Sequence, residues 1–118
     1  MVNGSVILNW IGFAKWVTFP DGHSEGVPIE SPCIESSAII GTDVIVMWEV
    51  TVSGGGDWGC SYTVKIDYVD NNGDPVTYSR NESCEKPGTH TWGAVIPYKY
   101  KAGTYTNLKG VISNVQSC

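Results

Sequence analysis

One stretch decides the fold of this chain, VIVMWEVTV at residues 44–52. All of its even-numbered positions are apolar, and a period of two is typical of a half-buried β-strand. These positions are Val44, Val46, Trp48, Val50 and Val52. Glycines occupy residues 54–56 and predict the end of the strand, because glycine weakens strands. The stretch therefore predicts a strand with one face on a hydrophobic core.

Segments on both sides of this strand repeat the pattern of short strand and turn. YTVKIDY at residues 62–68 alternates apolar and polar side chains, DNNGD at 70–74 is typical of a turn, and PVTYS at 75–79 is the expected return strand. Residues 86–88 and 101–103 carry further turn signals. No stretch has a helical period, so turns about every ten residues predict an all-β, antiparallel sandwich or barrel.

Composition limits the classes of function. A chain of 118 residues with 42% hydrophobic residues is long and apolar enough for one folded domain, and we treat residues 1–118 as a single domain. The formal net charge of −5 argues against nucleic acid or an anionic membrane as partner. No apolar run predicts a transmembrane helix, and no motif calls for a cofactor.

The turn at residues 71–73 predicts how two cysteines pair. A three-residue hairpin loop places Tyr68 opposite Val76, so that apolar side chains meet. Extending the same register places Cys60 opposite Cys84, at the separation that a disulfide requires. We therefore expect a Cys60–Cys84 disulfide.

The remaining two cysteines, Cys33 and Cys118, would then form a second disulfide. An even number of cysteines in a small, weakly charged, turn-rich chain favours disulfides over zinc and over the alternative of free buried thiols. The sequons at Asn3 and Asn81 are candidate glycosylation sites and fit the same compartment. Together these features predict a secreted or cell-surface glycoprotein.

The first residues differ from the other predicted strands. Residues 1–19 form an N-terminal strand with apolar side chains at both parities, which expects cover on both faces. Residues 20–32 are rich in turn formers and predict a loop or hinge. The candidate assembly residues in the strand are Val6, Leu8, Trp10, Ile11, Phe13, Trp16 and Val17. The strand packs either within its own sandwich or in that of a neighbouring copy.

Residues 36–115 resemble immunoglobulin-like extracellular modules. GTDVIVMWEV at 41–50 is similar to their second strand and CSYTVKIDY at 60–68 to their central strand. KPGTHTW at 86–92 and AGTYT at 102–106 resemble turns of CARDB-type surface domains. The resemblance implies an immunoglobulin-like β-sandwich that binds or builds rather than catalyses.

The main functional hypothesis joins this resemblance to the N-terminal strand. No sequence motif positions a nucleophile or a general base, so we predict no catalytic residue and no enzyme. We expect a structural or adhesive module, in the form of a pilus-like filament subunit assembled by donor-strand exchange. Its partners would be further copies of itself or a cell-surface molecule.

Two other binding functions stay open. A carbohydrate-binding module would stack sugars on a platform of Trp58, Tyr98 and Tyr100. The ending GTYT at 103–106 with Cys118 is similar to that of ML lipid-binding sandwiches, which implies a small lipid carrier.

A calcium site is the weakest of the candidate sites. Asp70, Asn72 and Asp74 offer hard oxygen ligands, but their spacing departs from that of a calcium loop. A plain hairpin turn explains the same residues better. We therefore predict no metal site.

Overall fold

The computed structural model describes residues 4–29, 33–34, 43–54, 56–96 and 103–118. Most of these residues lie in strands, and the only helical element among them is one turn of 3₁₀ helix. The elements are β1 (Ser5–Thr18), β2 (Ser24–Pro28), β3 (Cys33–Ile34), β4 (Asp43–Ser53), η1 (Gly56–Trp58), β5 (Cys60–Val69), β6 (Pro75–Glu85), β7 (Gly88–Val95), β8 (Gly103–Thr104) and β9 (Thr106–Ser117).

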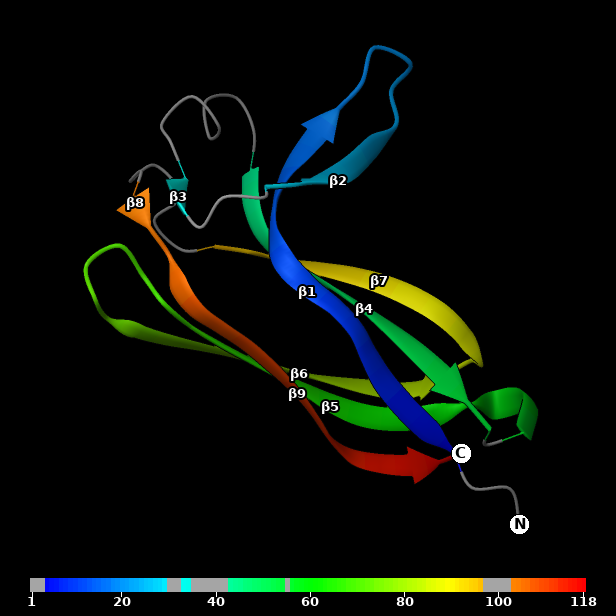
Figure 1. The fold of residues 1–118 in the computed structure, drawn as a ribbon. Helices are drawn as coiled ribbons and strands as arrows, with labels where there is room; N and C mark the ends of the chain where they lie inside the picture. The colour runs from blue at the N-terminus through cyan, green and yellow to red at the C-terminus, as the bar shows by residue number, and fades with distance from the viewer. Residues whose placement is uncertain (1–3, 30–32, 35–42, 55, 97–102) are drawn as a thin grey trace.

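Two antiparallel sheets form the body of the fold. One has the strand order β2-β1-β4-β7 and the other β6-β5-β9, while β3 and β8 make a short separate pair. Figure 1 shows the two larger sheets stacked, with β1 at the side where β9 lies. The prediction of an all-β antiparallel sandwich is confirmed.

The core lies between β4 and β5. The even-numbered face of β4 is buried as its sequence predicts, with Trp48 and Val50 0% exposed. Opposite it, β5 buries its own even-numbered residues, among them Val64 and Ile66. Alternating burial on both strands is what a strand with one face on a core requires.

The β5–β6 hairpin confirms most of the predicted register and breaks it at one point. Pairing follows the prediction from Val69 opposite Pro75 to Tyr62 opposite Glu82. A β-bulge then intervenes, and Cys60 faces Glu85 instead of Cys84. The predicted Cys60–Cys84 disulfide is therefore wrong, because one extra residue in the strand displaces the thiol.

The disulfide joins Cys84 to Cys118, with 5.7 Å between their Cα atoms. The predicted Cys33–Cys118 disulfide is therefore wrong too: Cys33 lies in β3, which pairs with β8 at the other end of the fold (Figure 1). The bond connects β6 to β9 across the central strand, where the Ser61 hydroxyl lies 3.8 Å and 3.5 Å from its two sulfurs. Cys60 is a free and fully buried thiol.

A β-bulge also explains the unusual pattern of the N-terminal strand. β1 pairs with β4 along its length, and its register shifts between Leu8 and Trp10. Leu8 faces Val50 before the shift and Ile11 faces Trp48 after it, so both point to the core. The extra residue moves the inward side chains from even to odd positions. Apolar residues at even positions before the bulge and at odd positions after it therefore lie on the same, core-facing side of β1.

The predicted loop or hinge at residues 20–32 contains a strand. β2 pairs with the end of β1, from Ser24 opposite Thr18 to Pro28 opposite Ala14. A tight turn joins the two strands, with Gly22 at a φ of 93° that favours glycine. β1 and β2 therefore form one hairpin, whose tip projects beyond the rest of the sheet (Figure 1).

Candidate functional site

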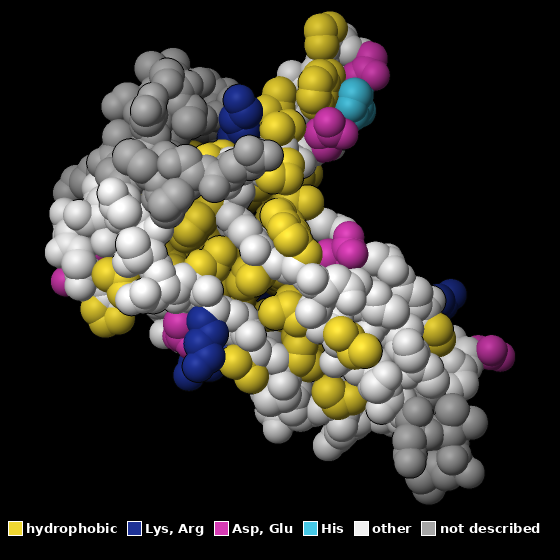
Figure 2. Space-filling view, in the orientation of Figure 1, with side chains coloured by type: hydrophobic (Ala, Val, Ile, Leu, Met, Phe, Trp, Pro, Cys, Tyr) yellow, Lys and Arg dark blue, Asp and Glu magenta, His cyan; other side chains and the backbone are white. Residues whose placement is uncertain are grey.

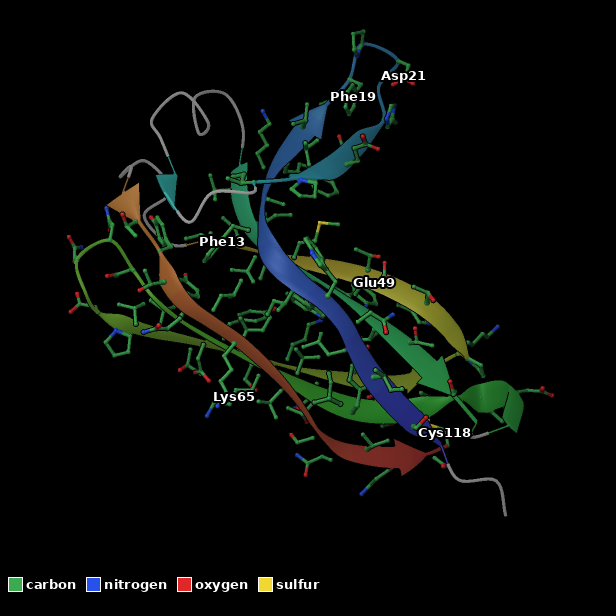
Figure 3. All side chains as sticks on the ribbon, in the orientation of Figure 1. Phe13, Phe19, Asp21, Glu49, Lys65 and Cys118 are labelled. Atoms are coloured by element: carbon green, nitrogen blue, oxygen red, sulfur yellow. A yellow bond between two sulfur atoms is a disulfide. The ribbon has the colours of Figure 1, made fainter. Side chains whose placement is uncertain are left out.

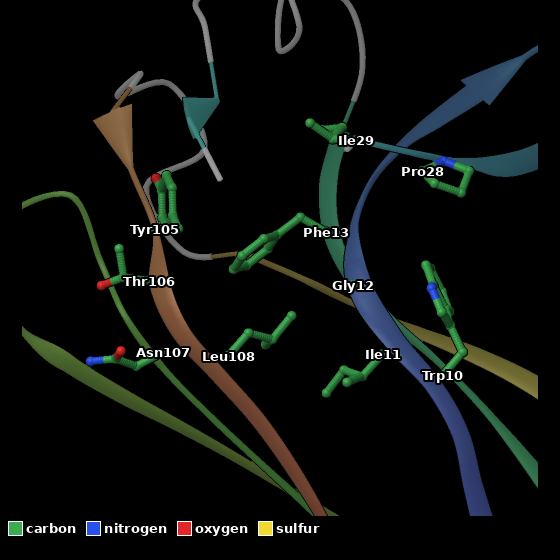
Figure 4. A pocket seen from close by; sticks show the side chains of 10 residues that line it. All are labelled: Trp10, Ile11, Gly12, Phe13, Pro28, Ile29, Tyr105, Thr106, Asn107 and Leu108. Atoms are coloured by element: carbon green, nitrogen blue, oxygen red, sulfur yellow. The ribbon is translucent and has the colours of Figure 1, made fainter. Parts of the chain in front are cut away.

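An apolar cleft of about 700 Å³ opens between β1 and β9 at one side of the sandwich. Figure 2 shows hydrophobic side chains gathered in this hollow. In Figure 4, Phe13, Ile11 and Leu108 point into the space between the two strands. The cleft is lined by Trp10, Ile11, Gly12, Phe13, Pro28, Ile29, Tyr105, Thr106, Asn107 and Leu108.

Two aromatic rings, Phe13 and Tyr105, line the cleft, and a third, Tyr68, packs against them. The ring of Phe13 lies 5.7 Å from that of Tyr68 and 5.6 Å from that of Tyr105, centre to centre. Burial raises the pKa of Tyr68 to about 12 and also raises the pKa of Tyr105. Tyrosines are neutral at physiological pH in any case, so the apolar lining of the cleft is what suits an apolar group rather than an ion.

The cleft ends where β1 touches β9. A Cβ at Gly110 would lie 2.7 Å from Leu8 Cδ2 and 3.0 Å from Ile11 Cδ1, so the glycine lets the two strands approach closely. Behind this contact the core is packed, with Trp48 and Ile66 0% exposed. The space is thus a lateral cleft and does not continue between the sheets.

Backbone hydrogen-bonding groups line the mouth of the cleft. Among the described strands, none pairs with the outer edge of β1 between Ser5 and Gly12, and none pairs with the outer edge of β9. Unpaired strand edges are ready templates for another strand. The side of the sandwich therefore combines apolar side chains with strand edges that no described strand covers.

On the opposite side of the sandwich, polar contacts hold the corner between β6 and β7. The Tyr62 hydroxyl donates to Glu85 Oε1 over 2.5 Å. Burial and this hydrogen bond raise the pKa of Tyr62. His90 Nε2 donates to the Lys86 carbonyl over 2.7 Å and lies 4.0 Å from Glu85 Oε1. These contacts secure the corner where the chain crosses from β6 to β7.

A cation lies next to this corner. Arg80 pairs with Glu82, and its guanidinium carbon lies 4.5 Å from the centre of the Trp92 ring. The arrangement is typical of a cation–π contact. The cluster was not predicted from the sequence, because Arg80 and Trp92 lie on different strands and belong to no recognised motif. We assign it a structural role, because the contact of Arg80 with Trp92 joins β6 to β7.

The candidate assembly residues divide between two surfaces. Val6, Leu8, Ile11 and Phe13 pack on the core, and the first three are only partly buried. The remaining apolar groups stay accessible, with Trp10 38% and Trp16 43% exposed. Val17 lies in the projecting part of the hairpin, where β1 pairs only with β2.

The structure describes only some of the other candidate residues. Trp58 lies in η1 with 70% of its side chain exposed, whereas Tyr98 and Tyr100 lie outside the described residues. Asn81 is exposed on β6, where its side-chain oxygen accepts a hydrogen bond from Thr63, and Asn3 lies outside the described residues. The sugar platform and one sequon thus keep the status of predictions.

The acidic turn at residues 70–74 stabilises the β5–β6 hairpin. Asp70 Oδ1 accepts hydrogen bonds from the backbone N–H groups of Asn72 and Asp74, each over 2.9 Å. Within the part of the chain that the structure describes, no group of three or more His, Cys, Asp or Glu side chains is placed to hold a metal. The carboxylate thus acts as a turn cap.

Comparison with known proteins adds no identity. The chain matches no protein-family model, and no curated protein or solved structure is significantly similar to it. None of the helices in the described ranges could cross a membrane. Function must therefore be argued from the surfaces themselves.

Proposed function

We propose that this chain is a non-catalytic structural or adhesive module of the immunoglobulin-like kind, whose copies assemble by exchanging the N-terminal hairpin. One observation carries the proposal: a terminal hairpin forms the edge of the sandwich beside an uncovered apolar cleft. An edge element can leave and be replaced without threading through the fold, which a central strand cannot do. Exchange of identical elements is a low-cost route to assembly.

The hairpin would move as a unit. β2 pairs with β1 and with no other described strand, so the main pairing that must open is β1 with β4. The same pairing re-forms between two copies, with Leu8, Ile11 and Phe13 entering the same positions against the core. Backbone hydrogen bonds to β4 would supply affinity, and these side chains would supply specificity.

The cleft supports the same proposal. It marks the part of the edge that the chain's own β1 leaves uncovered, next to backbone groups without strand partners in the described fold. An approaching copy would therefore meet apolar surface and an open edge together. If each copy receives one hairpin and gives its own to the next, the contact does not close and produces a fibre.

We further propose a secreted or cell-surface location. The Cys84–Cys118 disulfide supports it, because such bonds persist in oxidising compartments. Asn81 is exposed on β6 and would be accessible to a glycosylating enzyme. Mass spectrometry of the natural protein tests both features, by a shift of 2 hydrogens on reduction and by a glycan on Asn81.

A disulfide that locks β1 in its own sheet tests the exchange. Ser5 faces Ser53 across the β1–β4 pair, and both are exposed. We expect Ser5→Cys/Ser53→Cys, oxidised as a dilute monomer, to stay monomeric by light scattering while wild type forms dimers and longer species as concentration rises. Thr51→Cys/Thr89→Cys is the matched control, since it locks β4 to β7 and leaves β1 free.

Two results would reject the proposal. One is a locked protein that assembles as wild type does, because exchange is then not the route. The other is a wild type that stays monomeric at every concentration and gives no filaments by electron microscopy.

The cleft also favours a second candidate, a carrier of small apolar ligands. Its volume of about 700 Å³ lies within the range of roughly 300–1,000 Å³ that ligand pockets usually have. A fluorescent apolar probe, N-phenyl-1-naphthylamine, displaced by palmitate at one site per chain would support this function. Leu108→Trp, which fills the cleft, should then abolish probe binding.

A further inference from the structure

We propose that the outer face of the β2-β1-β4-β7 sheet binds a neutral glycan chain. The site lies apart from the cleft and does not depend on strand exchange. It centres on a hollow of about 380 Å³, in which Trp16 is 43% and Val95 58% exposed. The hollow is lined by Trp16, Ile45, Met47, Thr91, Trp92, Gly93 and Val95.

Two glycines leave room for the side chains that form the floor of the hollow. A Cβ at Gly26 would lie 2.6 Å from Met47 Sδ, and one at Gly93 would lie 2.9 Å from Ile45 Cδ1. The side chains of Met47 and Ile45 therefore lie across the neighbouring strands, in space that any other residue would fill. The result is a shallow apolar floor beside the accessible Trp16 ring.

A row of polar side chains continues this floor along the sheet. Asn9 Nδ2 donates to Glu49 Oε1 over 3.2 Å and to Thr51 Oγ1 over 2.6 Å. The hydroxyl oxygens of Thr51 and Thr89 lie 3.4 Å apart. Asn9 is the extra residue of the β1 bulge, so the bulge brings its amide into this row. We call Asn9, Glu49, Thr51 and Thr89 the polar row.

The floor and the polar row lie on one face. The outward side chains of β4 alternate with its core residues and are Ile45, Met47, Glu49 and Thr51. Figure 3 shows Glu49 on the side away from β9. The distance from Ile45 to Thr51 is about 20 Å at roughly 3.3 Å per residue. An elongated ligand of several rings fits this length.

The chemistry of the face selects the ligand class. A sugar ring has an apolar C–H face and a rim of hydroxyls, and the negative face of an aromatic ring attracts polarised C–H groups. Trp16 can take the C–H face while the polar row, with its oxygens and one amide, takes the hydroxyls. Glu49 is the single charge in the row and would disfavour an anionic chain, so the face suits a neutral glycan.

Titration with four soluble oligosaccharides tests the proposal, namely cellohexaose, chitohexaose, xylohexaose and mannohexaose, with binding followed by calorimetry. At least one should bind wild type, and Trp16→Ala should weaken that binding by about tenfold or more, which equals about 1.4 kcal/mol. Trp58→Ala is the matched control, because Trp58 is exposed but lies in η1. It should change the affinity less than twofold.

A second variant distinguishes a loss of sugar contacts from misfolding of Trp16→Ala. Glu49→Gln keeps the shape of the side chain and should weaken binding several-fold. The proposal is overturned if none of the four oligosaccharides binds, or if Trp58→Ala abolishes binding while Trp16→Ala retains it. Loss of self-association in Trp16→Ala without any sugar binding would instead assign the face to contacts between copies. Ser5→Cys/Ser53→Cys should bind the sugar as wild type does, so failure of exchange and failure of glycan binding are separable.

Discussion

The two long sides of the sandwich differ in the contacts that join the two sheets. Where β6 meets β7, the Arg80 guanidinium lies over the Trp92 ring, and Glu85 accepts a hydrogen bond from the Tyr62 hydroxyl. Where β1 meets β9, the contact rests on Leu8 and Ile11 against Gly110, and an apolar cleft remains open. We call these the polar side and the open side.

The difference bears on which edge could accept a strand from another copy. Paired charges and hydrogen bonds need partners at fixed positions, so a polar side disfavours the replacement of one strand by another. An apolar contact beside an unpaired backbone edge accepts any side chain of suitable size and shape. In the proposed exchange, the open side is the one that would separate, whereas the polar side would stay closed within each copy.

Loss of the disulfide should have the largest effect on this comparison, since the bond ties β6 of the polar side to β9 of the open side. Its cysteines are 34 residues apart, and a loop of that length contributes about 4 kcal/mol to stability in the chain-entropy view. We expect Cys84→Ser/Cys118→Ser to lose about this much in urea unfolding. Cys33→Ser leaves the bond intact and serves as control. A loss below about 1 kcal/mol would contradict the assigned pairing.

Truncation of Phe13 tests the open side alone. Phe13 is 6% exposed and contacts two aromatic rings, so Phe13→Ala should cost about 3 kcal/mol and widen the cleft. Urea unfolding measures the stability, and the fluorescence of an apolar dye should rise. Ile7→Ala on the same strand is the control, because Ile7 is 58% exposed and should change stability by less than about 0.5 kcal/mol. Equal losses in both variants would refute the distinction between the two faces of β1.

High pH should weaken both sides, and the contribution of a single phenol should be the smallest of the three effects. Because the folded state raises the pKa of Tyr68 from 10.0 to about 12, it holds this proton more tightly than the unfolded state. Stability is therefore complete below pH 10 and falls as pH rises towards 12, by roughly 2–3 kcal/mol for this group. Urea unfolding between pH 9 and about pH 12 measures the slope.

Two variants assign that slope to a side. Tyr68→Phe should make it shallower by removing the contribution next to the cleft, and Tyr62→Phe should do so by removing that of the polar side. An unchanged slope in both variants would mean that neither phenol governs alkaline unfolding.

Local patterns predicted much of the fold. The alternation in β4 gave the buried face correctly, and the turn at residues 71–73 gave the β5–β6 register as far as Tyr62. Both predictions rest on neighbours in the sequence. They succeed because strand period and turn geometry are set locally.

The errors arise at single inserted residues. The bulge near Cys60 moved Cys84 towards Cys118, and the bulge at Asn9 changed which side chains of β1 point inward. A bulge depends on how two strands fit, so sequence alternation alone does not reveal it. The same holds for the proposed glycan-binding face, where the neighbours of Trp16 come from β2, β4 and β7.

The position of β1 also determines how an exchanged assembly would carry force. Gly4 lies beside the end of β9, where its N–H donates to the Ser117 hydroxyl over 2.7 Å, so both ends of the body meet at one pole (Figure 1). Pulling a single copy by these ends would open that pole one contact at a time. In a chain of exchanged copies the tension would run lengthwise through β1, and its bonds to β4 would resist together as a shear joint.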